Sequence, residues 1–128
     1  YTLTTSLRDS LVWKSKKGVT AQWTAMGEGM VDWKAYFQRF AELCPKVPVQ
    51  IETISGFNRE LETDQDEFWK TWPKGKPASL RAFEAWAAKG QPKQAQKGGS
   101  KEEEQAYQLG EIERSIAFCK KLGLGRKS

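Results

Sequence analysis

The chain has 128 residues, with 21 Lys or Arg against 16 Asp or Glu and a net charge of +5. This length allows a single domain with a modest core, and an aromatic content of 12% that includes six Trp excludes a disordered chain. No apolar run approaches the roughly 20 residues that cross a bilayer, and no charged leader precedes an apolar segment, so we expect neither a membrane span nor a signal peptide. The sequence starts with Tyr1 rather than Met, and we therefore expect it to be cut from a longer one.

The basic residues are dispersed along the chain, and acidic runs such as Glu102–Glu104 interrupt them. Proteins that bind nucleic acid concentrate positive charge on one face, so we expect no nucleic-acid partner. The sequence has no His, which removes the commonest general base and the commonest metal ligand. Cys44 and Cys119 fall at apolar positions of expected helices, where free thiols behave as small hydrophobes, and we expect a reduced, cytoplasmic protein.

The first part of the chain predicts a short strand and a hairpin. The Thr-rich residues 1–6 alternate loosely, as a strand does. The runs Leu11–Trp13 and Val19–Trp23 flank a polar turn that ends in Gly, which indicates a hairpin in which Trp13 and Trp23 can pair. A flexible basic loop is the alternative.

An amphipathic helix and a second strand are expected next. Asp32 is typical of a helix cap, and Pro45 ends the helix because the residue before a proline avoids helical angles. Residues 47–54 alternate with polar side chains such as Gln50 and Glu52 on one face, which is the pattern of an inward-facing barrel strand. The apolar face of the helix is formed by Trp33, Phe37, Phe40, Ala41 and Cys44.

The rest of the chain predicts three helices separated by polar linkers. The helices are expected over Asp64–Trp72, Ser79–Lys89 and Glu102–Leu122. Residues 91–101 have almost nothing to bury, and we expect them to form a flexible linker. The last helix carries one apolar stripe, made by Leu109, Ile112, Ile116, Cys119 and Leu122.

Three motifs together carry a resemblance to a known family. They are Ser6-Leu7-Arg8-Asp9 before the hairpin, Gly27-Glu28-Gly29-Met30-Val31-Asp32-Trp33 at the start of the helix, and Val49-Gln50-Ile51-Glu52-Thr53 after it. In this order they resemble the xylose-isomerase-like (β/α)8 barrels, in particular the carboxyl-terminal part of a sugar phosphate isomerase/epimerase. The resemblance covers about residues 2–57, and Leu109–Ser115 is similar to the terminal helix of some members.

The resemblance implies an α/β fold that consists of the last strands and helices of a TIM barrel, with a β-hairpin insertion and a helical C-terminal tail. It implies a barrel segment over residues 1–57 with the hairpin at 11–23, a helical extension over 58–90, a flexible linker over 91–101 and a C-terminal helix over 102–128. So few strands leave sheet edges unpaired. We therefore expect self-association or pairing with a missing N-terminal half of the barrel.

The resemblance also implies a metal site and a substrate site. The family's last metal ligand is a Glu at the end of the final barrel strand, and Glu52 matches it, so Glu52 is the expected metal ligand and catalytic residue. The metal would be divalent Mn, Mg, Co or Zn. Ser6 replaces the family's ligating His, and a hydroxyl is a poor substitute for imidazole. The other ligands lie on strands outside this chain, so we expect no tight metal binding by the segment alone. The expected substrate contacts are Arg8, Asp9, Trp23, Gly27, Glu28 and Gly29.

Each of these residues also has a purely structural interpretation. Glu52 can be a salt-bridged surface carboxylate, and Arg8 and Asp9 can pair with each other across a turn. Glycines in such a loop are turn residues more often than ligand contacts. Trp23 suits the core or a wall at least as well as a stacking platform.

These observations lead to three hypotheses about function. The first is part of a metal-dependent isomerase or epimerase of a small sugar or sugar phosphate, in which the metal polarises oxygens and carboxylates move a proton between carbons. The second is a non-catalytic relative that acts as a binding or structural module, which Ser6 in place of His favours. The third, a basic nucleic-acid binder, predicts steeply salt-dependent binding to DNA or RNA.

Overall fold

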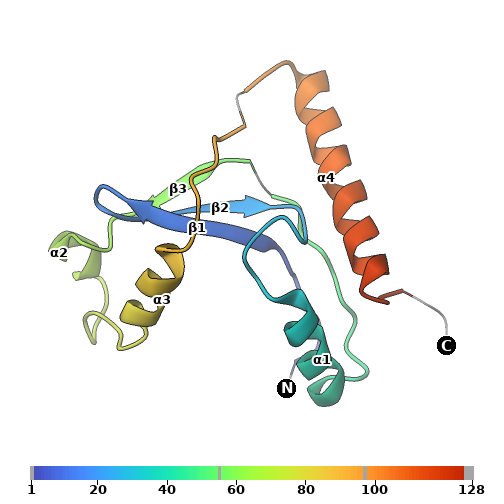
Figure 1. The fold of residues 1–128 in the computed structure, drawn as a ribbon, viewed down its shortest axis with the longest axis horizontal. Coiled ribbons are helices and arrows are strands. Elements are labelled where there is room, and N and C mark those ends of the chain that lie inside the picture. The colour runs from blue at the N-terminus through green and yellow to red at the C-terminus, as the bar shows by residue number, and fades with distance from the viewer. Residues whose placement is uncertain (1, 55, 97, 126–128) are drawn as a thin grey trace.

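The computed structural model describes residues 2–54, 56–96 and 98–125. Three strands form a sheet at the centre of the molecule, with two helices toward each end of it (Figure 1). In chain order the elements are β1 (Asp9–Ser15), β2 (Gly18–Thr24), α1 (Trp33–Leu43), β3 (Asn58–Leu61), α2 (Asp66–Trp69), α3 (Leu80–Ala87) and α4 (Lys101–Lys121). The short helices α2 and α3 lie near one end of the sheet, and α1 and α4 lie near the other (Figure 1).

The sheet is antiparallel throughout and has the order β1–β2–β3. The hairpin closes with Ser15 opposite Gly18, and β3 pairs with the other side of β2. The expected partial (β/α)8 barrel is therefore wrong, because barrel strands run parallel and are connected through helices. The hairpin is not an insertion into a larger sheet. It supplies two of the three strands of the sheet itself.

The two hairpin tryptophans do not pair, and this expectation was wrong. The two-residue turn sets a register in which Trp13 lies opposite Thr20 and Trp23 lies opposite Ser10. Trp13 is buried in the body, whereas Trp23 lies half-buried near the base of the hairpin. The register therefore places Trp23 close to the segments that enter and leave the sheet.

The strand expected at residues 1–6 is absent from residues 2–6, the part of it that the structure describes, and the strand expected at 47–54 does not form either. In their place is an isolated parallel bridge between Leu7 and Ile51. The Leu7 N–H donates to the Gln50 carbonyl at 2.9 Å, and the Glu52 N–H donates to the Leu7 carbonyl at 2.8 Å. On the N-terminal side the Thr5 side chain takes the place of the backbone in this ladder: its hydroxyl accepts the Gln50 N–H at 2.9 Å and donates to the Pro48 carbonyl at 3.0 Å. The third strand of the sheet is β3, which we did not expect.

Two small clusters of buried side chains make up the core. One lies between the sheet and α3 and contains Val12, Val19 and Ala87, with Phe83 and Trp86 packed against it. The other joins α1 to α4. Its buried residues come from these two helices and from the loop after β2, and none of them belongs to a strand. Its members are Met26, Trp33, Phe37 and Cys119. The second cluster holds the helices against the base of the hairpin.

The caps of the two longest helices follow from local sequence. Asp32 caps α1, as expected, and its carboxylate accepts the Ala35 N–H at 3.0 Å. Ser100 caps α4 and forms a reciprocal capping box with Glu103. The first turn of α4 is acidic and its last turn contains Lys120 and Lys121, which suits the helix dipole at both ends.

Helix α4 presents its polar side to the protein and much of its apolar stripe to solvent. Leu109, Ile112 and Ile116 are 58%, 41% and 42% exposed. The side chains of Glu111 and Ser115 are buried. Among the five stripe residues only Cys119 is buried, so the stripe meets the core only near the C-terminal end of the helix.

The remaining helices are shorter than the sequence led us to expect. α2 covers Asp66–Trp69, and its buried Trp69 donates its indole N–H to the Thr63 carbonyl at 2.9 Å.

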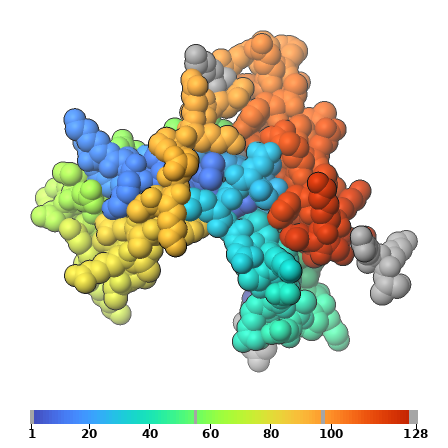
Figure 2. All heavy atoms as spheres, in the orientation of Figure 1, coloured from blue at the N-terminus to red at the C-terminus, as the bar shows by residue number. Residues whose placement is uncertain are grey.

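The chain after α3 crosses the face shown in Figure 2 on its way to α4. There the Gln94 carbonyl accepts a hydrogen bond from the Gln22 side chain at 3.3 Å. None of the helices in the described ranges has the length and apolar character needed to span a membrane.

Candidate ligand-binding site

The carboxylate of Asp9 organises the loop between β2 and α1. Asp9 is fully buried. One of its oxygens accepts the N–H groups of Gly27 and Gly29, both at 2.9 Å. The other accepts those of Ser10 at 2.8 Å and Val31 at 3.3 Å. Asp9 was an expected substrate contact, and the structure gives its carboxylate four internal donors instead.

The two glycines of this loop are required by close packing inside the protein. Gly27 has a φ of +86°, and a side chain there would meet the ring of Phe118. A side chain on Gly29 would meet the Asp9 carboxylate. Their backbones approach a side chain of the same protein, so the structure explains both glycines without a ligand.

Glu28 joins the same loop to α4. Its carboxylate lies 2.6 Å from Arg114 Nε and 3.7 Å from Lys93 Nζ. Beside it, the Met26 N–H donates to the Ser115 hydroxyl at 3.0 Å, a buried bond. The expected substrate contact at Glu28 is thus an ion pair that fixes the position of α4.

The other three expected site residues come together at the base of the hairpin. Glu52 lies 2.8 Å from Arg8 Nη2 and accepts the Ser6 hydroxyl at 2.9 Å. The guanidinium of Arg8 lies over the ring of Trp23, 5.2 Å from its centroid. We call Arg8, Glu52 and Trp23 the Arg–Glu–Trp cluster. Arg8 and Glu52 keep about a third of their side chains exposed, at 31% and 32%.

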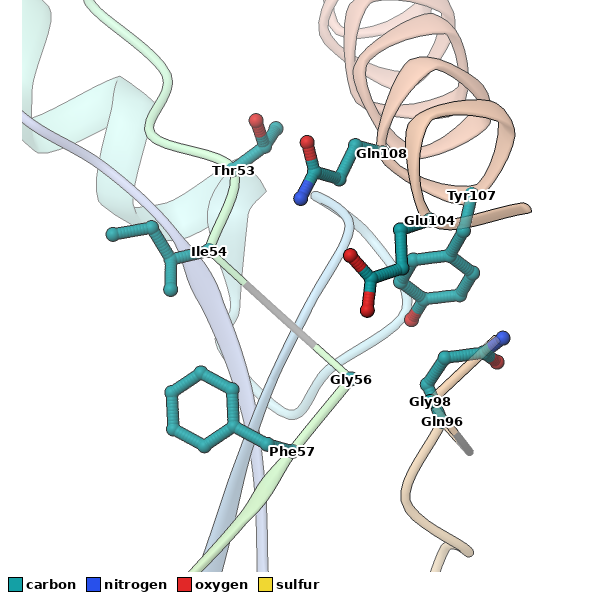
Figure 3. Close-up of a pocket in the computed structure, with 9 residues that line it drawn as sticks. All are labelled: Thr53, Ile54, Gly56, Phe57, Gln96, Gly98, Glu104, Tyr107 and Gln108. Carbon is teal, nitrogen blue, oxygen red and sulfur yellow. The ribbon is translucent and has the colours of Figure 1, made fainter. Parts of the chain in front are cut away.

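A pocket of about 360 Å³ lies next to the Arg–Glu–Trp cluster, between α4 and the segment that follows Glu52. We call it the α4 pocket. Phe57 joins it to the cluster, because its ring is 5.1 Å from that of Trp23. Figure 3 shows Thr53 across the pocket from Gln108, with Phe57 on the same side as Thr53. The described lining residues are Thr53, Ile54, Gly56, Phe57, Gln96, Gly98, Glu104, Tyr107 and Gln108.

Backbone bonds hold the wall of the pocket in place. The Gly56 N–H donates to the Trp23 carbonyl at 3.2 Å, and the Gly56 carbonyl accepts the Gln96 N–H at 2.5 Å. The segment after Glu52 is therefore tied to β2 on one side and to the linker on the other. The segment after Glu52 and the linker form two walls of the pocket, and α4 forms another. The position of α4 depends on the loop held by Asp9.

Tyr107, one of the residues that line the pocket, is hydrogen-bonded to a buried acid. Its hydroxyl donates to Glu111 at 3.1 Å, and Glu111 is only 2% exposed. Burial raises the pKa of the Glu111 carboxyl above its ordinary value, although the Tyr107 hydrogen bond and the charge of Arg114 act in the opposite direction. Burial likewise raises the pKa of the Cys119 thiol above its ordinary value.

The polar side chains of the site can form hydrogen bonds with a polar ligand. Glu104 offers acceptors, Gln108 offers both a donor pair and an acceptor, and Thr53 offers a hydroxyl. Phe57, at 45% exposure, offers an apolar face. Within the described ranges no three His, Cys, Asp or Glu side chains gather in a way that could hold a metal ion. Glu52 is the expected metal ligand, and the same carboxylate oxygen meets both Arg8 and Ser6.

The sequence analysis named Arg8, Trp23 and Glu52 as site residues, and it missed the residues that line the α4 pocket. Phe57 follows a turn glycine and gave no periodic signal. Tyr107 and Gln108 belong to α4, and the sequence pattern of this helix predicts only its apolar stripe. The spacing of Tyr107 and Glu111, one turn apart on a helix, was a signal that could have been used.

Comparisons with protein-family models, with curated proteins and with solved structures give no match. They neither support nor refute the resemblance to xylose-isomerase-like proteins, and the isomerase activity it implies stays a prediction. Any function proposed for this chain therefore depends on the geometry of the site.

Replacing Asp9 with Ala should destabilise the fold by about 2–4 kcal/mol, because several part-buried backbone N–H groups lose the buried carboxylate that accepts from them. Asp9→Asn should also destabilise it, since the amide would place N–H groups against two of these donors. Urea denaturation of each variant measures the effect. The exposed Asp64→Ala is the matched control and should change the free energy of unfolding by less than about 0.5 kcal/mol. A stable Asp9→Ala protein would contradict this role of the carboxylate.

Replacing Glu111 with Gln should change how stability depends on pH. A raised pKa in the folded state means that Glu111 favours folding fully below its unfolded pKa, near 4.5, and that this contribution is lost as the pH rises through the folded value. Glu111→Gln should match the wild type near pH 4 and exceed its stability at pH 7, because a neutral amide needs no desolvation of charge. Thermal melting between pH 4 and 8 measures this. Glu113→Gln, an exposed site on the same helix, should leave the profile unchanged.

Proposed function

We propose that this protein is a non-catalytic binding module that takes a small neutral sugar in the α4 pocket, next to the Arg–Glu–Trp cluster. The observation that carries the proposal is the combination at one place of an internally matched ion pair, an exposed aromatic ring and uncharged polar groups. A sugar presents hydroxyls that both donate and accept, together with an apolar C–H face. Each of these features has a counterpart in the site.

The size of the pocket supports a ligand of this kind. Small-molecule sites have volumes of roughly 300–1,000 Å³, and about 360 Å³ is at the lower end of that range. A single sugar ring fits such a space better than a dinucleotide or a long peptide. Thr53 and Gln108 face each other across it (Figure 3) and can bind hydroxyls on opposite sides of one ring.

The charges of the site favour a neutral sugar over a sugar phosphate. The charge of Arg8 is already matched by Glu52 at 2.8 Å. The described residues that line the pocket include the carboxylate of Glu104 and neither Lys nor Arg. A phosphate would therefore meet an unmatched negative charge with no cation assigned to it. This excess of acid is local, because the chain as a whole carries +5.

Binding is tested by titrating the protein with neutral monosaccharides, such as glucose and xylose, and with glucose 6-phosphate, while recording amide NMR spectra. We expect shifts at Phe57, Tyr107 and Gln108 with neutral sugars and weaker or no shifts with the phosphate. Phe57→Ala and Gln108→Ala should each weaken binding about five- to tenfold, the effect of one lost contact. Gln105→Ala, on an exposed part of the same helix, should not change it.

Three results would contradict the proposal. They are an absence of shifts with every sugar, tighter binding of the phosphate than of the neutral sugar, and equal losses in Gln105→Ala and Gln108→Ala. Turnover of a sugar phosphate by this chain with added Mn²⁺ or Mg²⁺ would instead favour the isomerase interpretation and its use of Glu52.

A further inference from the structure

A second cavity lies between α1 and the C-terminal end of α4, two elements that are side by side in Figure 2. It has a volume of about 620 Å³, and it shares no described lining residue with the α4 pocket. We call it the α1 groove. One wall is a single face of α1, and the other is the last turn of α4 with the residues that follow it. The residues that line it include Lys34, Phe37, Ala41, Lys121, Leu122 and Leu124.

The wall from α4 is fixed by the way in which this helix ends. Gly123 has a φ of +91°, and its N–H donates to the Lys120 carbonyl at 3.0 Å. The Leu124 N–H donates to the Cys119 carbonyl at 3.1 Å. These two bonds form a Schellman motif, which turns the chain back so that Leu124 packs against the core cluster that contains Phe37. The α1 groove is therefore formed by the fold itself, before any ligand binds.

The charged side chains of the α1 groove all carry the same sign. Lys34 comes from one wall and Lys121 from the other, and no Asp or Glu is among the described residues that line the groove. Within the described part of the chain neither lysine forms an ion pair. Glu28 borders a separate, smaller hollow with Lys121, but Arg114 already pairs with it at 2.6 Å. The groove thus has unmatched positive charge, which favours an anionic ligand.

Beyond the two lysines the walls of the groove are largely apolar. Phe37 is only 9% exposed, and Leu122 and Leu124 are half-buried. Ala41, one turn after Phe37, has a short side chain that leaves space along α1. An inorganic anion would leave these apolar surfaces in water, and an uncharged hydrocarbon would leave both ammonium groups unmatched. A ligand that fits both features has an anionic group at the end of a hydrocarbon chain.

We propose that the α1 groove binds a medium-chain fatty acid. Its carboxylate lies between Lys34 and Lys121, where each oxygen can meet one ammonium group, and its acyl chain lies along Phe37, Leu122 and Leu124. The volume of about 620 Å³ is within the range of roughly 300–1,000 Å³ that small-molecule sites have. The proposal is independent of the sugar ligand, because the α4 pocket is lined by other residues.

Isothermal titration of the full chain with octanoate, 1-octanol and acetate tests the class of ligand. We expect octanoate to bind with a Kd below about 1 mM and 1-octanol about three- to tenfold more weakly, because the alcohol lacks the charge. Acetate should not bind measurably, because it has no chain to bury. Equal affinities for octanoate and 1-octanol would overturn the proposal, and so would an absence of octanoate binding up to about 10 mM.

Substitutions locate the site. Lys34→Gln and Lys121→Gln should each weaken octanoate binding about two- to fivefold and leave 1-octanol binding unchanged. Lys16→Gln is the matched control, because it removes the same charge in the hairpin turn, between β1 and β2. Equal losses of octanoate affinity in Lys16→Gln and Lys34→Gln would contradict the proposed position of the carboxylate.

A new acid in the groove provides a second test. Ala41→Asp should weaken octanoate binding more than about tenfold, because it places a carboxylate beside that of the ligand and beside its chain. Ala85→Asp, at an exposed alanine of α3, introduces the same charge elsewhere and should leave the affinity unchanged. Circular dichroism and thermal melting verify that the variants remain folded. A folded Ala41→Asp protein that binds octanoate as tightly as the wild type would overturn the proposal.

Discussion

The interaction on which the rest of this structure depends is the set of hydrogen bonds between the buried Asp9 carboxylate and the loop after β2. This carboxylate accepts four backbone N–H groups and so converts a glycine-containing loop into a rigid connection. The loop then presents Met26 and Glu28 to α4, where they meet Ser115 and Arg114. These two contacts join α4 to the body of the protein, and both depend on the loop. The position of α4 in turn decides where the pocket lies and which side of the helix faces solvent.

Helix α4 consequently has two faces with different roles. Its inner face is polar, with Glu111 and Ser115 buried, and it contributes Tyr107 and Gln108 to the pocket. Burying an acid is costly, and here Tyr107 offsets part of that cost by donating a hydrogen bond to Glu111. The outer face keeps Leu109, Ile112 and Ile116 exposed. A helix that met the body through its apolar stripe would have buried these residues and left Glu111 in solvent, with no wall for a ligand site.

Much of the local structure could be predicted from the sequence, because its causes are local. Asp32 caps α1, Pro45 lies just beyond its end, and the polar turn before Val19 closes the hairpin. The arrangement of the sheet could not be predicted, since the pairing of β2 with β3 joins segments that are far apart in the chain. The orientation of α4 could not be predicted for a similar reason. The contacts of Ser115 with Met26 and of Arg114 with Glu28 form only in three dimensions, and they hold the polar side of the helix against the body of the protein.

The roles in a binding site that the sequence suggested for three residues remain predictions. Arg8, Trp23 and Glu52 do lie together, but at the base of an antiparallel hairpin and not at the mouth of a barrel. Hydrogen exchange at the amides of Gly27 and Gly29 tests most directly whether the Asp9 carboxylate fixes the loop. These amides should be protected to the same degree as those in the centre of β2, because their acceptor is buried. Exchange at the rate of an open loop would contradict the account.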